Sequence, residues 1–464
     1  MFILDSKNGQ TLHAKIYNQI KNQILSGNLQ PHTKLPSIRN LCAELSVSHN
    51  TIEYAYQQLF AEGYIYSKPK SGYYVSLLDS EFAQPSRKHS GILSGQNSQK
   101  QRTYAYDFHP ACLSPESFPT QVWRKLFMDC LQEDAKQLTS YGSQQGDFAL
   151  RCEIQRYLAR SRGVACEAEQ IVVCSGLQDS LSIIVPILRE NHSMLAVEDP
   201  GHFIPKSVFQ NHLFSVTPIP VNSDGLDLIA LQNTASTVVY VTPSHQFPLG
   251  HIMPVANRLN LIDWAQNVGG VIIEDDYDSE LRYHGSPIPA LQGLRPQGNI
   301  VYIGTFSKVL SPALRVSYMV LPQRFLDTYH KLFDDYSTTV SLLEQRTLYK
   351  FMNQGYWDRH LRKMRTIYKK KHDTLLQAVN RHFGAQVTIL GQGAGLHVVL
   401  KLVNNSLAEE ELISRALAKD VRLIPLSKTC LCNNSRQSQV MLGFGGININ
   451  EIDRGVELLY QAWY

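Results

Sequence analysis

The sequence of 464 residues has few cysteines and no long apolar run. Its eight cysteines are too sparse for a disulfide scaffold, and a lone C-x-C at Cys430 and Cys432 argues against a zinc site. The longest apolar stretch, residues 183–188, is far too short to span a bilayer. The residues around Asp5 and Lys7 lack the apolar core of a signal peptide. These absences predict a soluble protein of the reducing cytoplasm that does not contact a membrane.

The sequence also lacks a large excess of charge of either sign. Lys and Arg number 44 against 40 Asp and Glu, a net charge of +4, so a chain that coats nucleic acid along its whole length is not expected. Residues 1–78 hold seven of the bases and four of the acids, which is +3 of that total. Any contact with nucleic acid is therefore expected in this segment, although a solvated surface would explain the charge equally well.

The N-terminal segment has the pattern of three helices followed by a hairpin. Isoleucines recur at helical spacing over residues 16–24, and further helices are predicted after Pro36 and after Ser48. Ser46 and Ser48 are both candidate N-caps of the third helix. This order predicts a winged helix-turn-helix, whose third helix enters the DNA major groove. Two short strands separated by a basic turn complete it: residues 64–66 and 73–75.

Three parts of this segment carry a family resemblance. They read Leu35-Pro36-Ser37-Ile38-Arg39, Val47-Ser48-His49-Asn50-Thr51-Ile52 and Ala61-Glu62-Gly63-Tyr64-Ile65. Over residues 10–76 the chain closely resembles the DNA-binding module of the GntR family, in which an arginine usually stands in place of His49. The resemblance implies contacts with operator DNA from Lys34, Arg39, Ser48, His49, Asn50 and Thr51. In the hairpin, Lys68 and Lys70 would neutralise phosphates. The alternative is a small helical domain that binds no nucleic acid.

The remainder of the chain divides into a linker and an α/β region. Residues 79–103 are rich in Ser, Gln, Lys and Gly, which predicts a flexible linker after the DNA-binding domain 1–78. Over residues 104–330 apolar strand candidates alternate with helical stretches, which predicts a large α/β domain with a mostly parallel sheet. Residues 331–464 begin with long helices and continue with strands, as in a small α+β subdomain. The strand candidates of the large domain are residues 171–174, 194–197, 238–241, 271–273 and 300–303.

Two segments of the large domain carry its chemistry. They read Gly304-Thr305-Phe306-Ser307-Lys308, followed by Leu314-Arg315, and Ile272-Ile273-Glu274-Asp275-Asp276-Tyr277. The pair resembles the site of a pyridoxal-phosphate (PLP) enzyme of fold type I, in the aspartate aminotransferase family. The resemblance implies that Lys308 forms a Schiff base with the cofactor and that Asp275 keeps the pyridine nitrogen protonated.

The same resemblance assigns further contacts to the cofactor. Tyr277 would donate to the ring hydroxyl, and His202 stands where an aromatic ring usually covers the pyridine, unless it is a surface histidine. His245 or Gln246 takes the place of the family's asparagine at the ring hydroxyl. The phosphate would be bound by the side chains of Thr305, Ser307 and Arg315 and by backbone amides at a helix start, those of Gly176, Leu177 and Gln178.

A GntR-type module joined by a linker to an aminotransferase-like domain is the layout of the MocR/GabR regulators. The segments VTPSHQFPLGHIMPV, IIEDDYDSE and YIGTFSKVLSPALRVSYMVLP resemble the GabR branch most closely, and the resemblance covers essentially the whole chain. It implies a transcription factor that binds operator DNA and PLP, as a domain-swapped homodimer. A ligand amine would displace Lys308, and the resulting external aldimine would change the affinity for DNA by a shift of population.

The choice of ligand depends on a carboxylate clamp. In the GabR branch two arginines are credited with holding the amino-acid carboxylate. In this sequence the first of these two arginine positions is occupied by Ile204, which cannot pair with a carboxylate. Arg436 lies near the second position. This argues against GABA and leaves another amine, another amino acid or PLP itself as the effector.

Two alternatives to a sensor remain. The chain could be a catalytically active aminotransferase that carries a DNA-binding domain, with Lys308 as its proton carrier. It could instead hold an inert dimerisation domain that has lost the cofactor. The presence of Lys308, Asp275 and Arg315 argues against the inert domain.

Overall fold

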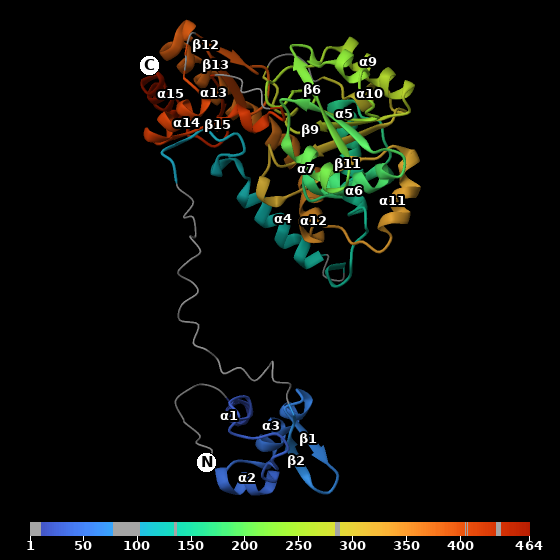
Figure 1. Cartoon of the computed structure of the whole chain (residues 1–464), viewed down its shortest axis with the longest axis vertical. Helices are drawn as coiled ribbons and strands as arrows, with labels where there is room; N and C mark the ends of the chain where they lie inside the picture. The colour runs from blue at the N-terminus through green and yellow to red at the C-terminus, as the bar shows by residue number, and fades with distance from the viewer. Residues whose placement is uncertain are drawn as a thin grey trace. The chain divides into compact units, whose positions relative to one another are not determined.

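The computed structural model describes residues 11–77, 103–133, 137–283, 288–403, 405, 407–432 and 438–464. The chain forms two compact units, Met1–Arg102 and Thr103–Tyr464 (Figure 1). Most of the predicted linker, residues 79–102, lies outside the described residues, and so does Arg436.

The first unit consists of three helices and a hairpin, as predicted. Strands β1 and β2 pair antiparallel, with Ile65 opposite Val75. Fully buried side chains from all three helices, Ile20, Leu41 and Ile52, form its core. The elements are α1 (Leu12–Leu25), α2 (Ile38–Leu45), α3 (His49–Ala61), β1 (Ile65–Lys68) and β2 (Gly72–Val75).

Two serines begin the second and third helices of this unit. Ser37 Oγ accepts a hydrogen bond from Asn40 N at 3.2 Å, and Ser48 Oγ accepts one from Thr51 N at 3.4 Å. Each serine satisfies an amide that helix geometry leaves without a partner. Ser46, the other candidate N-cap of α3, instead ends α2 in a left-handed conformation with a φ of 53°. That prediction is wrong, because this residue turns the chain between the two helices.

The second unit is built on an eight-stranded sheet with the order β4-β11-β10-β9-β8-β5-β6-β7. The neighbours from β10 through β9, β8 and β5 to β6 are all parallel, which confirms a mostly parallel sheet. Strand β11 runs antiparallel between β10 and β4, and β7 is antiparallel to β6. The strands are β4 (Ile171–Cys174), β5 (Met194–Asp199), β6 (Ser215–Asn222), β7 (Gly225–Leu226), β8 (Val238–Val241), β9 (Val271–Asp276), β10 (Ile300–Thr305) and β11 (Ser317–Val320).

Three of these strands extend beyond their apolar residues. Strands β5, β9 and β10 each run two or three residues further than the apolar pattern predicts. In β9 the additional residues are Glu274, Asp275 and Asp276, whose side chains are at most 6% exposed. The carboxyl end of the central sheet therefore carries three buried acidic side chains.

Helices cover both faces of the sheet (Figure 1). The adjacent residues Ile272 and Ile273 of β9 point to opposite faces and join different cores. The core on the Ile273 side includes side chains of α6 (Leu177–Arg189), α7 (Phe203–Asn211) and α11 (Leu326–Phe333). On the other side lie α5 (Phe148–Arg162), α9 (Val255–Asn267) and α10 (Leu291–Leu294), and α8 (Leu228–Gln232) packs beside α9.

The C-terminal part of the unit has its own four-stranded sheet, with the order β12-β13-β16-β15. The short strand β3 (Tyr106–Asp107), at the start of the unit, pairs with β14 (Val421–Arg422) of this part. The remaining elements are α4 (Thr120–Glu133), α12 (Leu342–Asn353), α13 (Tyr356–Phe383), β12 (Val387–Leu390), β13 (His397–Leu402), α14 (Glu409–Ala418), β15 (Ile424–Pro425), β16 (Gln439–Gly443) and α15 (Ile449–Trp463).

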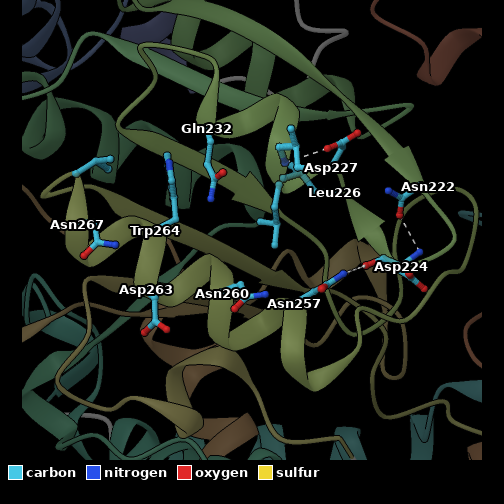
Figure 2. Close-up of a pocket in the computed structure, with 13 residues that line it drawn as sticks. Asn222, Asp224, Leu226, Asp227, Gln232, Asn257, Asn260, Asp263, Trp264 and Asn267 are labelled. Atoms are coloured by element: carbon cyan, nitrogen blue, oxygen red, sulfur yellow. Dashed lines mark hydrogen bonds between the residues drawn. The ribbon is translucent and has the colours of Figure 1, made fainter.

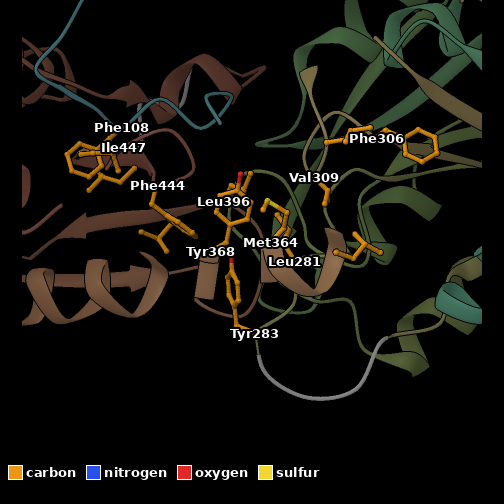
Figure 3. Close-up of a cluster of buried hydrophobic side chains, with 14 of the residues drawn as sticks. Phe108, Leu281, Tyr283, Phe306, Val309, Met364, Tyr368, Leu396, Phe444 and Ile447 are labelled. Atoms are coloured by element: carbon orange, nitrogen blue, oxygen red, sulfur yellow. The ribbon is translucent and has the colours of Figure 1, made fainter. Parts of the chain in front are cut away.

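One hydrophobic cluster joins this part to the large domain (Figure 3). Phe306 and Val309, which follow β10, belong to the same cluster as Met364 and Tyr368 of α13 and Phe444 after β16. The segment that carries Lys308 is therefore anchored on both sides by buried apolar side chains. Among the described residues no helix is both long and apolar enough to cross a bilayer.

Candidate cofactor site and DNA-binding surface

Lys308 follows strand β10 and is half-buried in the second unit. Its Nζ lies 3.5 Å from the carbonyl oxygen of Pro110 and 5.9 Å from the centre of the Tyr277 ring. Burial lowers the pKa of the Lys308 amine, while the nearby carboxyls of Asp278 and Asp275 oppose that shift. A lysine with a lowered pKa is more often the free amine, which is the form that attacks a carbonyl group.

Asp275 lies in β9, opposite Ile303 of the neighbouring strand β10. Its carboxylate accepts a hydrogen bond from the Tyr240 hydroxyl. Burial raises the pKa of Asp275 to about 7, although the Tyr240 hydrogen bond and the charge of Lys308 lower it. A buried carboxyl of this kind is suited to a protonated ring nitrogen, because a cationic partner stabilises the charged carboxylate.

Arg315 and Gly176 meet where β4 leads into helix α6. Arg315 has a left-handed backbone with a φ of 52°, and its Nη2 donates to the carbonyl oxygen of Ser175 at 3.0 Å. Gly176 has a φ of 91°, and a Cβ at this position would overlap the Arg315 guanidinium. The absence of a side chain at 176 therefore lets the guanidinium lie against the start of α6, where an anion is also favoured by the helix dipole.

One of the three backbone amides predicted to bind the phosphate at the start of α6 has another partner. The Gly176 N–H donates to Ser317 Oγ at 2.9 Å and so is not available to an anion. Leu177 and Gln178 are the first residues of α6, so their amides are not used by the helix itself. Thr305 Oγ1 accepts from the Ser307 amide at 3.1 Å, which shapes the turn before Lys308.

His202 begins helix α7, and its Nδ1 accepts from the Ile204 amide at 3.2 Å. Its ring is stacked on Phe203, with the ring centres 5.1 Å apart. Burial, with a smaller effect from the positive charge of Lys308, lowers the pKa of His202 to about 4. The imidazole is therefore neutral near pH 7 and can present a flat, uncharged face. Ile204 packs at the edge of the core formed with α6.

His245 is held between two neighbours in the buried part of the site. Its Nδ1 lies 3.0 Å from Asp278 Oδ2 and 3.0 Å from the Tyr277 hydroxyl. Its Nε2 is buried and has no hydrogen-bond partner among the described residues. Gln246, the other candidate at this place, donates to the Pro200 carbonyl oxygen at 2.9 Å and so holds the loop instead. His245 is thus the residue that lies beside Tyr277.

These features together fit PLP. The described residues supply a half-buried amine of lowered pKa, a buried carboxyl that interacts with it electrostatically, an arginine at a helix start and a buried imidazole nitrogen without a partner. Tyr240 and Asp278, which form hydrogen bonds with Asp275 and His245, are not among the residues predicted from the sequence. The acid-rich run Asp275-Asp276-Tyr277-Asp278 at the end of β9 is the signal that points to Asp278.

A buried ion pair lies beneath the site. Arg162 Nε donates to Asp276 Oδ2 at 2.6 Å, and the Tyr302 hydroxyl donates to the same oxygen at 2.6 Å. Arg162 Nη2 also donates to Ser244 Oγ at 2.6 Å, immediately before His245. This network links helix α5 to β9, β10 and the His245 loop, and sequence spacing gives no sign of it.

Another pocket, of about 670 Å³, lies between the β6–β7 hairpin and helices α8 and α9 (Figure 2). Figure 2 shows Asn257, Asn260, Trp264 and Asn267 along α9 on its wall. None of the residues predicted to contact PLP lines it. This pocket is therefore separate from the candidate cofactor site.

The residues predicted to contact DNA lie around the start of α3 and in the hairpin of the first unit. His49 and Asn50 are the first two residues of α3, and Thr51, which is half-buried, completes the serine cap. His49 Nδ1 lies 3.4 Å from the Glu53 carboxylate one turn later. Seven of the eight residues are exposed: Lys34, Arg39, Ser48, His49, Asn50, Lys68 and Lys70.

Comparisons with known families agree with this division. Residues 12–75 match the family of bacterial regulatory proteins called gntR, and residues 112–453 match aminotransferase class I and II. The chain is 38% identical to the HTH-type transcriptional regulator YdeL of Bacillus subtilis, over 97% of this chain and 96% of that protein. It is 31% identical to the rhizopine catabolism regulatory protein MocR of Rhizobium meliloti, over 100% and 96%.

Solved structures share the fold of the second unit. A multiple substrate aminotransferase from Thermococcus profundus has a TM-score of 0.71 at 23% identity, over 78% of this chain and 92% of that one. The aminotransferase LysN from Thermus thermophilus, solved with N-(5'-phosphopyridoxyl)-L-leucine, has a TM-score of 0.68 at 24% identity, over 77% and 91%.

These matches define a transcriptional regulator with a GntR-type DNA-binding domain and an aminotransferase-like domain of fold type I. The chain belongs to the MocR-type branch of the GntR family of bacterial regulators. Both the family and the fold class predicted from the sequence are confirmed.

Removal of the Asp276 carboxylate tests the buried ion pair. In Asp276→Ala, Arg162 stays charged inside the core without its partner, so we expect the free energy of unfolding to fall by about 3–5 kcal/mol. Asp263→Ala is the control, because its partner Arg295 lies 3.5 Å away on the surface, and we expect a change of at most about 1 kcal/mol. Chemical denaturation measures the free energy of unfolding of both variants. An equal decrease in Asp276→Ala and Asp263→Ala would contradict the prediction.

The raised pKa of Asp275 predicts a pH dependence of stability. An unfolded aspartate has a pKa of about 3.9, so between about pH 4 and pH 7 the folded chain binds a proton that the unfolded chain does not. The contribution of this group to stability is therefore present at low pH and is lost as the pH rises through that interval. Asp275→Asn removes the titration.

Denaturation of the cofactor-free wild type and of Asp275→Asn at about pH 5 and pH 8 measures the effect. We expect the wild type to lose stability relative to the variant as the pH rises. A stability difference that stays constant between the two pH values would show that Asp275 titrates as an exposed carboxyl does.

Proposed function

We propose that this regulator binds PLP in its second unit through a covalent bond in which Lys308 Nζ would replace the oxygen on the cofactor's aldehyde carbon, with that oxygen released as water. The observation that carries the proposal is the Lys308 amine of lowered pKa, which interacts with the buried Asp275 carboxyl. When bound, the cofactor supplies an aldehyde and an electron-withdrawing ring. All other roles belong to the residues of this chain.

The surrounding residues have distinct roles in the proposal. Asp275 faces the ring nitrogen and keeps it protonated, and neutral His202 covers the ring. Tyr277, held by His245, donates to the ring hydroxyl. The phosphate group is bound by Arg315, Thr305, Ser307 and the amides of Leu177 and Gln178, with Gly176 providing the space for the guanidinium.

The first unit is proposed to bind operator DNA with the start of α3 in the major groove. Because Ser48 caps α3, the exposed Asn50 and half-buried Thr51 lie at the helix end that meets the base edges. Lys68 and Lys70 in the hairpin would neutralise phosphates, and Lys34 and Arg39 add charge nearby in the sequence. The protein is proposed to act as a homodimer with exchanged DNA-binding units, because a dimer contacts two half-sites of an operator. Its proposed location is the cytoplasm.

The effector is proposed to be an amine, an amino acid or PLP itself, which alters DNA affinity through the bond at Lys308. Ile204 packs among apolar side chains, so it offers no partner to a carboxylate and GABA is not favoured. A relative, PdxR of Corynebacterium glutamicum, is 28% identical over 84% of this chain and 83% of that protein, and its name refers to pyridoxine biosynthesis. That name supports PLP among the effectors.

The second candidate function is transamination with physiological turnover. Lys308 could move protons in such a reaction, because its pKa is lowered by burial. The GntR-type domain on the same chain favours regulation. Release of a keto product over many cycles would favour the enzyme.

Lys308→Ala tests the covalent bond to the cofactor. We expect the purified wild-type protein with PLP to absorb near the visible edge and to retain the cofactor after reduction with borohydride and denaturation. Lys308→Ala should lose at least about 90% of the retained cofactor, because no amine remains at that position. Lys331→Ala, an exposed lysine of α11, is the control and should retain it. Equal retention in wild type and Lys308→Ala would contradict the proposal.

A further inference from the structure

A pocket of about 510 Å³ in the second unit is rich in arginine. It lies between α5, the segment after β9 and the first turns of α13, and none of the residues proposed to contact PLP lines it. Two carboxyl groups, those of Glu280 and Asp358, are also on its wall. Five arginines are among the residues that line it: Arg160, Arg162, Arg282, Arg362 and Arg365.

Two of these five arginines have carboxylate partners. Arg162 is paired with Asp276 in the core, and Arg160 lies 3.4 Å from Asp358. Among the described residues, the other three arginines have no carboxylate within ion-pair distance. Like charges held around one pocket repel each other, so the arrangement favours a ligand that brings negative charge.

Arg362 and Arg365 are exposed, and Arg282 is half-buried. Arg365 Nε donates to the backbone oxygen of Glu280 at 2.7 Å, which fixes its guanidinium at the wall and leaves its terminal nitrogens for another acceptor. Arg282 Nε is buried and has no hydrogen-bond partner in the described part of the chain. A buried donor without an acceptor costs free energy, which a bound acceptor would recover.

The Glu280 side chain does not neutralise these arginines. Its Oε1 accepts from the Tyr157 hydroxyl at 2.9 Å, and its Oε2 is buried without a partner. Burial, with a further effect from Asp276, raises the pKa of Glu280 to about 7. This carboxyl therefore carries less negative charge near neutral pH than an exposed glutamate does.

We propose that this pocket is a second ligand site of the regulator, which binds a small organic polyanion through Arg282, Arg362 and Arg365. The ligand carries at least two phosphate or carboxylate groups, because three arginines without carboxylate partners line a space of about 510 Å³, which is larger than one such group needs. Planar guanidiniums bind both groups through paired hydrogen bonds. The site is separate from the proposed cofactor site and does not depend on it.

Titration calorimetry of the full-length protein with pyrophosphate and, separately, with citrate tests the proposal. We expect at least one probe to bind the wild type, and the double variant Arg362→Gln/Arg365→Gln to bind it at least about ten-fold more weakly. The two probes distinguish phosphate from carboxylate recognition. The candidate cofactor site is the same in both proteins, so the difference in affinity reports on this pocket.

Lys369→Gln is the matched control, since it removes an exposed positive charge from the same helix outside the pocket. We expect its affinity for the probe to stay within about two-fold of the wild type, as only screened surface charge changes. Failure of both probes to bind, equal binding by the double variant, or an equal loss in Lys369→Gln would each overturn the proposal. Unfolding curves of all three proteins show that a lost affinity is not a lost fold.

Discussion

The burial of three consecutive acidic side chains at the end of β9 is the constraint on which the rest of the second unit depends. Charged carboxyls in a protein core are costly unless each one has a partner. Glu274 accepts from two backbone amides of α10, and Asp276 is paired with Arg162. Asp275 accepts from the Tyr240 hydroxyl and interacts with Lys308. A cation beside Asp275, at the candidate cofactor site, would therefore be favoured.

The topology of the sheet brings the other groups to the same edge. Because β9 and β10 are parallel neighbours, Asp275 near the end of β9 and Lys308 just after β10 lie at the same edge of the sheet. Strand β11 then returns antiparallel between β10 and β4, so Arg315, just before it, reaches the start of α6 at Gly176. The antiparallel strand interrupts the parallel order at the point where Arg315 meets the start of α6.

The sequence predicts those parts of this arrangement that depend on local pattern. Apolar periodicity locates the three helices of the first unit, the whole of β4 and β8, and the apolar first residues of β5, β9 and β10. The motif around Lys308 indicates the candidate site. Local pattern does not predict polar groups that are buried against partners distant in the sequence, as at Glu274. It also does not show that a predicted donor has a partner within the protein, as the Gly176 amide has in Ser317 Oγ. The arginine pocket joins α5, the segment after β9 and α13, so no local pattern reveals it. Domain boundaries and the roles of the site residues stay predictions.

The central claim is that the aminotransferase-like domain controls the DNA-binding domain through Lys308. The most direct test is the affinity of the full-length protein for DNA from upstream of its own gene, at fixed salt, with and without PLP and a panel of amines and amino acids. We expect at least one condition to change the wild-type affinity by about five-fold or more, and none to change that of Lys308→Ala. Equal DNA affinities of the wild type across all conditions would contradict the account.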